Sequence, residues 1–205
     1  MEYNNFEIST KEDIKIENVR IPEGTVKIEN HAFQYCGKLK SVIIPNTVTS
    51  IGKEAFEECE ELSNIIIPDS VTSIDNFAFY HCRSLSGIII PDSVVRIGHS
   101  VFAGCAGLSY VVLPKTITKI KSYTFCNCTN LKVIDIPDNV ISIETRAFAN
   151  CKNLECVTIP KSVEYISSDA FAGCINLKRI LLPKKLMHIC DTDIFPKNCK
   201  IDYLK

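Results

Sequence analysis

The stretch AFYHC, residues 78–82, places an aromatic ring, a histidine and a cysteine close together. A cysteine beside a histidine is the pair that a thiol nucleophile and its general base require, and both side chains are metal ligands. The chain has 11 cysteines and 4 histidines among 205 residues, so such chemistry has many candidate positions. Whether Cys82 is reactive or structural depends on the pattern around it.

A second candidate for chemistry is the segment HICDTDIFPKNC, residues 188–199. It gathers one histidine, two cysteines and two aspartates: His188, Cys190, Asp191, Asp193 and Cys199. Zinc sites are typically built from pairs such as C-x-x-C and H-x-x-x-H, and neither occurs here. We therefore expect no metal and no cofactor, and interpret the segment as part of a cap.

Prolines divide the chain at a constant interval of 23 residues, at positions 22, 45, 68, 91, 114, 137, 160 and 183. Phenylalanine, cysteine and leucine recur at the same interval, the cysteines at 36, 59, 82, 105, 128, 151 and 174. Repetition at a fixed period of this length is the signature of a solenoid, in which stacked coils build one continuous core.

One repeat reads L-x-x-V-x-I-P-x-x-V-x-x-I-x-x-x-A-F-x-x-C-x-x-L. Its V-x-I portion alternates with a period of two, which predicts a strand that ends at the proline. The portion from the next isoleucine to the leucine is spaced by three and four, which favours a short helical or 3₁₀ segment. The repeats therefore predict an α/β solenoid of about eight coils, with a parallel sheet on its concave side.

These repeats resemble the BspA-like class of leucine-rich repeats, most clearly in IPDSVTSIDNFAFYHCRSL, residues 67–85. The resemblance extends over about residues 14–195 and implies a right-handed horseshoe. It also implies a role in recognition or adhesion, because members are typically surface proteins that contact host proteins or other cells. We expect one domain, 1–205, with an N-terminal cap (1–20), seven full repeats (21–181) and a divergent C-terminal capping repeat (182–205).

The repeat gives Cys82 a structural role. It is one of seven equivalent cysteines and lies between Phe79 and Leu85, which belong to the predicted core. A buried free cysteine behaves as a small hydrophobic residue, whereas a reactive thiolate needs a polar, electropositive surrounding. We predict eleven free thiols, a column of equivalent free cysteines and no enzymatic activity.

A binding surface is expected on the concave face, where the residues between and before the buried V and I positions point outward. These include an apolar, β-branched stripe that ends at an aspartate, with a tyrosine standing beside a glycine. Such a stripe is of the size that suggests a partner, although β-branched pairs also stabilise any sheet. The predicted partner-binding residues are Ile43, Asn64, Ile66, Gly87, Ile89, Tyr110, Val112 and Asp135.

Two functional interpretations follow. The first is a non-enzymatic module that binds a protein ligand, such as a host or cell-surface protein; the second is a structural or self-associating segment of a larger surface adhesin. A net charge of −1 gives no general attraction to nucleic acid, and the apolar runs are too short to insert into a membrane. The start of the chain lacks a signal-peptide pattern, which favours the cytoplasm, whereas the resemblance favours the cell surface.

Overall fold

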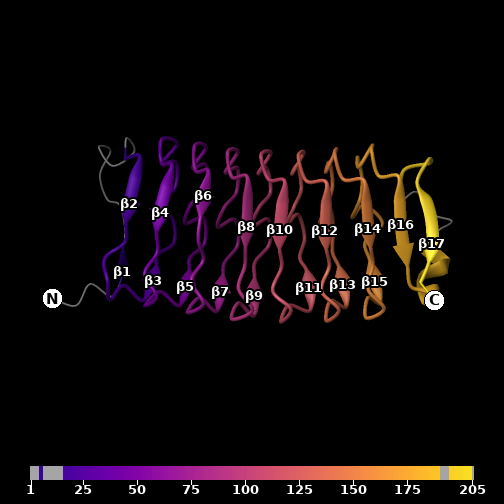
Figure 1. The fold of residues 1–205 in the computed structure, drawn as a ribbon, viewed down its shortest axis with the longest axis horizontal. Helices are drawn as coiled ribbons and strands as arrows, with labels where there is room; N and C mark the ends of the chain where they lie inside the picture. The colour runs from indigo at the N-terminus through magenta and orange to yellow at the C-terminus, as the bar shows by residue number, and fades with distance from the viewer. Residues whose placement is uncertain (1–4, 7–15, 190–193, 205) are drawn as a thin grey trace.

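The computed structural model describes residues 5–6, 16–189 and 194–204 of the chain. The chain winds through successive coils that stack along the long axis of the molecule, with two rows of parallel strands (Figure 1). The solenoid predicted from the repeats is confirmed. Much of the predicted N-terminal cap lies outside the described residues, so the boundaries of the caps stay predictions.

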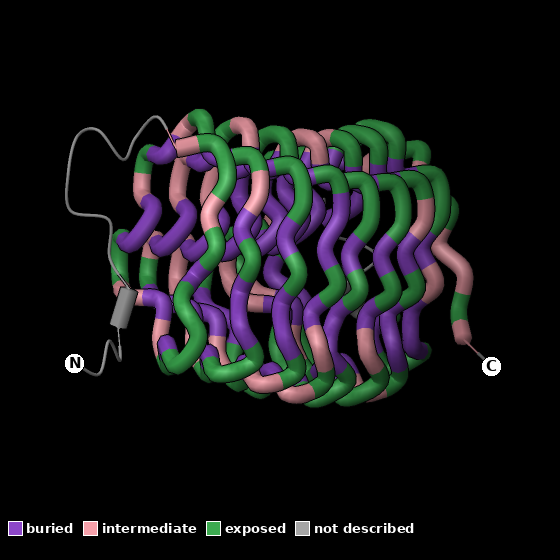
Figure 2. Tube along the Cα trace, turned by 60° about the vertical axis from the view of Figure 1, so that its left-hand side comes forward, coloured by how far each residue is buried: buried purple, intermediate pink, exposed green. Residues whose placement is uncertain are grey.

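The first row is formed by the V-x-I segments. Its strands are β2 (Asn18–Arg20), β4 (Ser41–Ile43), β6 (Asn64–Ile65), β8 (Gly87–Ile89), β10 (Tyr110–Val112), β12 (Val133–Asp135), β14 (Cys156–Thr158), β16 (Arg179–Leu182) and β17 (Lys200–Tyr203). Alternation along each strand buries one side chain and exposes the next, as Val42 and Ile43 show in β4. Figure 2 shows buried and exposed residues alternating along the coils. We call the solvent side of this row the strand face; it is the predicted concave face.

The second row consists of two-residue strands that the sequence did not predict. They are β1 (Asn5–Phe6), β3 (Lys27–Ile28), β5 (Ser50–Ile51), β7 (Ser73–Ile74), β9 (Arg96–Ile97), β11 (Lys119–Ile120), β13 (Ser142–Ile143) and β15 (Tyr165–Ile166). Each strand of this row from β3 to β15 contains the isoleucine that the spacing had assigned to the start of a helical segment. Backbone N–H groups here donate to the preceding coil, as from Thr49 to the Val26 carbonyl at 2.8 Å. Pairing between coils therefore replaces the local bonds of a helix.

The side of the coil opposite the strand face is made of turns, so the predicted helical segments are wrong. Two residues in most coils have a positive φ, for example Phe77 at 59° and His81 at 57°, and this backbone conformation interrupts a right-handed helix. Alternate N–H groups donate to the next coil, as from Phe56 to the Ala78 carbonyl at 2.8 Å. Among the described residues, the assigned helical segment is the 3₁₀ helix η2 (Lys184–Ile189) near the C-terminal end.

Phenylalanine rings form the centre of the core. Seven of them stack along the solenoid with centroids 5.0–5.7 Å apart and planes within 12° of parallel: Phe33, Phe56, Phe79, Phe102, Phe125, Phe148 and Phe171. Phe195 extends the stack beyond the last regular coil, but its ring is tilted by 46°. The core is therefore continuous from coil to coil, and only its last ring departs from the repeat.

None of the helical structure in the described parts has the length and apolar character needed to cross a bilayer.

Candidate functional site

Cys82 is a buried structural residue in the structure. Its side chain has no exposed surface, and its Sγ–H donates to the Phe56 carbonyl at 3.1 Å. Burial raises the pKa of the Cys82 thiol well above its ordinary value, so a thiolate is disfavoured. The ring of His81 stacks on Tyr80 at 4.0 Å, and its Nδ1 lies 3.4 Å from Glu58 Oε1. The arrangement has none of the features of an activated nucleophile.

Most of the other described cysteines are also buried. The ten that the structure describes are free thiols, and Cys190 lies outside the described residues. Five more in the repeated column donate to a phenylalanine carbonyl of the coil before: Cys59, Cys105, Cys128, Cys151 and Cys174. Only Cys156 and Cys199 among the ten are more than marginally exposed. Each of these carbonyls also accepts a backbone N–H within its own coil, so the thiol is a second donor that links one coil to the next.

The second chemical candidate is only partly visible. Cys190, Asp191 and Asp193 lie outside the described residues, and so does the side chain of His188. Within the described parts of the chain, no three histidine, cysteine or acidic side chains gather as metal ligands. The expectation that this segment is a cap rather than a metal site therefore stays a prediction.

The strand face displays the predicted apolar stripe. Its most exposed members are Ile66 and Ile89, at 75% and 60%, and the exposed row continues in Ile43 and Val112. Tyr110 pairs in register with Gly87, and a side-chain carbon at Gly87 would meet the tyrosine ring at 2.0 Å. Gly87 is therefore buried under Tyr110, and a larger residue at this position would displace the ring.

Two shallow hollows lie along this stripe. One, of about 280 Å³, lies between β4 and β6, and the other, of about 290 Å³, lies between β6 and β8. Asn64 and Ile66 line both, whereas Asp69, Ile89 and Tyr110 line the second alone. The structure thus brings together seven of the eight predicted residues around the stripe: Ile43, Asn64, Ile66, Gly87, Ile89, Tyr110 and Val112.

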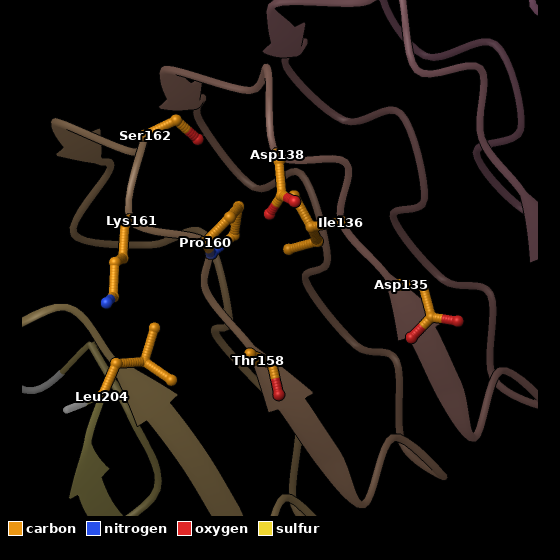
Figure 3. A pocket seen from close by; sticks show the side chains of 8 residues that line it. All are labelled: Asp135, Ile136, Asp138, Thr158, Pro160, Lys161, Ser162 and Leu204. Atoms are coloured by element: carbon orange, nitrogen blue, oxygen red, sulfur yellow. The ribbon is translucent and has the colours of Figure 1, made fainter.

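Asp135, the eighth, belongs to a larger hollow of about 660 Å³ farther along the strand face. Its lining also includes Thr158 from β14, Asp138 and Lys161 from the turns that follow β12 and β14, and Leu204 from the C-terminal segment (Figure 3). The sequence interpretation included Asp135 among the partner-binding residues, but it did not include the other four. Asp138 and Lys161 occupy the same repeat position, directly after the repeated proline. This shared polar position was the feature of the sequence that could have identified them.

The repeats of the chain match a known protein family. The family model described as "BspA type Leucine rich repeat region (6 copies)" matches residues 8–111 and 96–205. None of the curated proteins matches the chain significantly. The solved structures give several similar chains.

The crystal structure of a T. pallidum leucine-rich repeat protein is 31% identical, covers 93% of this chain and 88% of its own, and has a TM-score of 0.76. A leucine-rich cell surface protein from Faecalibacterium prausnitzii is 29% identical with a TM-score of 0.57; the match covers 80% of this chain but only 59% of that one. The pneumococcal vaccine antigen PcpA is 21% identical, with a TM-score of 0.61, over 100% of this chain and 45% of its own, and supports the fold alone.

Proposed function

The chain belongs to the BspA-type leucine-rich repeat family, and on that premise we propose that it is a non-enzymatic module that binds a protein partner across its strand face. The observation that carries this proposal is the exposed stripe of Ile43, Ile66, Ile89 and Val112 beside Tyr110. Exposed apolar side chains that lie side by side are typical of an interaction surface. An aromatic residue at the edge of such a surface is a common anchor for a partner.

The comparisons support recognition in general terms. The F. prausnitzii relative is described as a cell surface protein, and a surface location for the present chain is part of the proposal. The fully buried Cys82, whose thiol pKa is raised by burial, supports a non-enzymatic role because it supplies no activated nucleophile.

The test is affinity capture from extracts of host-cell surface proteins, followed by direct binding measurements with each purified candidate. The variant Ile66→Glu/Tyr110→Ala removes the centre of the stripe, and Ile175→Glu is the matched control. Ile175 is 69% exposed, similar to Ile66, but lies in a turn away from the strand face. We expect binding to survive in the control and to fall at least about tenfold in the double variant. Equal binding by both would contradict the proposal.

Self-association is the second candidate, because the same exposed stripe could pair with another copy of the chain. Sedimentation velocity over a range of protein concentrations separates the two. Association that grows with concentration and is lost in Ile66→Glu/Tyr110→Ala would favour the self-associating segment over the receptor for another protein.

A further inference from the structure

We propose that the hollow around Asp135 and Asp138 accepts a lysine or arginine side chain of the bound protein. This inference rests on the proposed function and adds to it the chemistry of the partner. The hollow, of about 660 Å³, falls in the range of sites that bind small molecules or long side chains. Its residues Asp135 and Thr158 are exposed strand residues of the row that also carries the apolar stripe, and Figure 3 shows how the lining residues lie around the hollow.

The charge of the lining favours a cation. Two aspartates and one lysine line the hollow, and Asp135, Asp138 and Lys161 are all exposed. Within the described parts of the chain, none of the three side chains makes a hydrogen bond or ion pair. The repeat-equivalent Asp92 differs, because its Oδ1 accepts the Lys115 backbone N–H at 2.7 Å. Two carboxylates and one ammonium group thus line the hollow, which leaves it with one negative charge in excess.

The apolar part of the lining suits a long basic side chain. Ile136 and Pro160 are buried beneath the hollow, and Leu204 from the C-terminal segment is half-buried at its side. Lysine and arginine bury their methylene stems on such surfaces and keep the charged group at the polar end. A carboxylate that accepts hydrogen bonds from an ammonium or guanidinium group forms one of the stronger contacts in proteins. The Thr158 hydroxyl offers a further acceptor in the same hollow.

The position of the hollow predicts the spacing of the partner's residues. Asp135 continues the outward column of Ile66, Ile89 and Val112, one residue per coil. With about 4.8 Å between strands, Ile66 and Asp135 are about 14 Å apart along the solenoid. An extended peptide advances about 3.3 Å per residue, so about four residues cover this distance. The predicted partner segment is therefore extended, with two alternate apolar residues followed by a basic residue.

Three fluorescent peptides test this inference by anisotropy: Ac-SLSLSKS-NH2 and its counterparts with glutamate or methionine in place of lysine. The wild type, Asp135→Asn/Asp138→Asn, Ile66→Glu and Glu164→Gln are compared after their folding is checked by circular dichroism. Glu164→Gln is the control because it removes an exposed carboxylate next to the second strand row. We expect the wild type and this control to bind the lysine peptide about three- to fivefold more tightly than the methionine peptide, and the Asp135→Asn/Asp138→Asn variant to lose that preference.

Tighter binding of the glutamate peptide would overturn the inference and make Lys161 the anchor. A lysine preference that persists in Asp135→Asn/Asp138→Asn would also overturn it, as would the absence of binding by all three peptides. The same measurements test the proposed function separately from the charge preference. If the methionine peptide binds the wild type but not Ile66→Glu, the apolar stripe binds a partner even where the charge preference fails.

Discussion

At the residue scale, burial decides what the cysteines can do. The sequence around Cys82 suggested a nucleophile. In the structure its thiol is fully buried in the core and donates to a backbone carbonyl. The repeat made this role predictable, because seven cysteines with the same neighbours cannot each be a catalytic residue. The carbonyl acceptor was not predictable, since it belongs to a phenylalanine of the coil before, 26 residues earlier in the chain.

Burial of these thiols also makes stability depend on pH. The pKa of Cys105 is raised from 9.0 to about 12 in the folded protein, so in this interval the unfolded chain has lost a proton that the folded chain keeps. The stabilisation is complete below the unfolded pKa and is lost as the pH rises, by about 1.4 kcal/mol per pH unit for this thiol. Urea unfolding between about pH 8 and about pH 10.5 should therefore give a shallower loss of stability for Cys105→Ala than for the wild type. Equal slopes would contradict the prediction.

The number of thiols is a separate prediction. Thiol titration in denaturant without reductant should find all 11 cysteines free. In the native protein, among the ten described cysteines, Cys156 and Cys199 should react first, because the other eight are buried. Mass spectrometry after brief alkylation identifies the modified sites. Seven or fewer thiols in denaturant would show that disulfides form.

At the scale of the element, local sequence predicted one strand row and missed the other. Val42 and Ile43 alternate between core and solvent, and this period of two is visible in the sequence. Ile51 lies in a strand because neighbouring coils supply its hydrogen bonds, and spacing by three within one coil looked helical instead. The turns opposite the strand face were missed for the same reason, because Phe33 and Phe56 bond to residues of the next coil.

Two glycines in different turns, Gly24 between the two strand rows and Gly104 opposite the strand face, distinguish backbone strain from lack of space. Gly104 has a φ of 77°, and a side-chain carbon there would lie 1.9 Å from the His81 ring; Gly24 has a φ of 87° with nothing within 4 Å. Alanine at either position adds left-handed strain of about 1 kcal/mol, but only Gly104→Ala also displaces a stacked ring. Thermal unfolding should show the larger loss for Gly104→Ala. The double variant His81→Ala/Gly104→Ala should recover part of it, and additive losses would exclude this contact as the cause.

At the scale of the whole molecule, the same 23-residue period that predicts the solenoid also limits what can be predicted at its end. The column from Ile43 to Asp135 follows from counting, and the structure places these residues in one exposed row. Leu204 could not be placed in this way, because β17 pairs Lys200 with Arg179, which is 21 residues earlier rather than 23. The hollow around Asp135 and Asp138 is therefore partly a product of the change in register at the C-terminal coil.

The stacking of coils in one line also predicts that a substitution in the last coil destabilises mainly that end of the molecule. Each coil contacts only its neighbours, so the stability of a coil depends on its own packing and on two interfaces. Phe195→Ala removes the tilted last ring, whereas Phe102→Ala removes a fully buried ring from the middle of the stack. We expect Phe102→Ala to lower the free energy of unfolding by about 3–5 kcal/mol. Phe195→Ala should cost less, because that ring has only one neighbour in the stack.

Hydrogen exchange read by mass spectrometry should then separate the two variants in space. In Phe195→Ala, faster exchange should be confined to β16 and β17, while β4 to β10 keep the protection of the wild type. In Phe102→Ala, protection should fall in the coils on both sides of the missing ring, because that ring stacks on Phe79 and Phe125. A uniform loss of protection in Phe195→Ala would show that the coils unfold as one unit. The interfaces between neighbouring coils would then be strong enough to make unfolding cooperative over the whole solenoid.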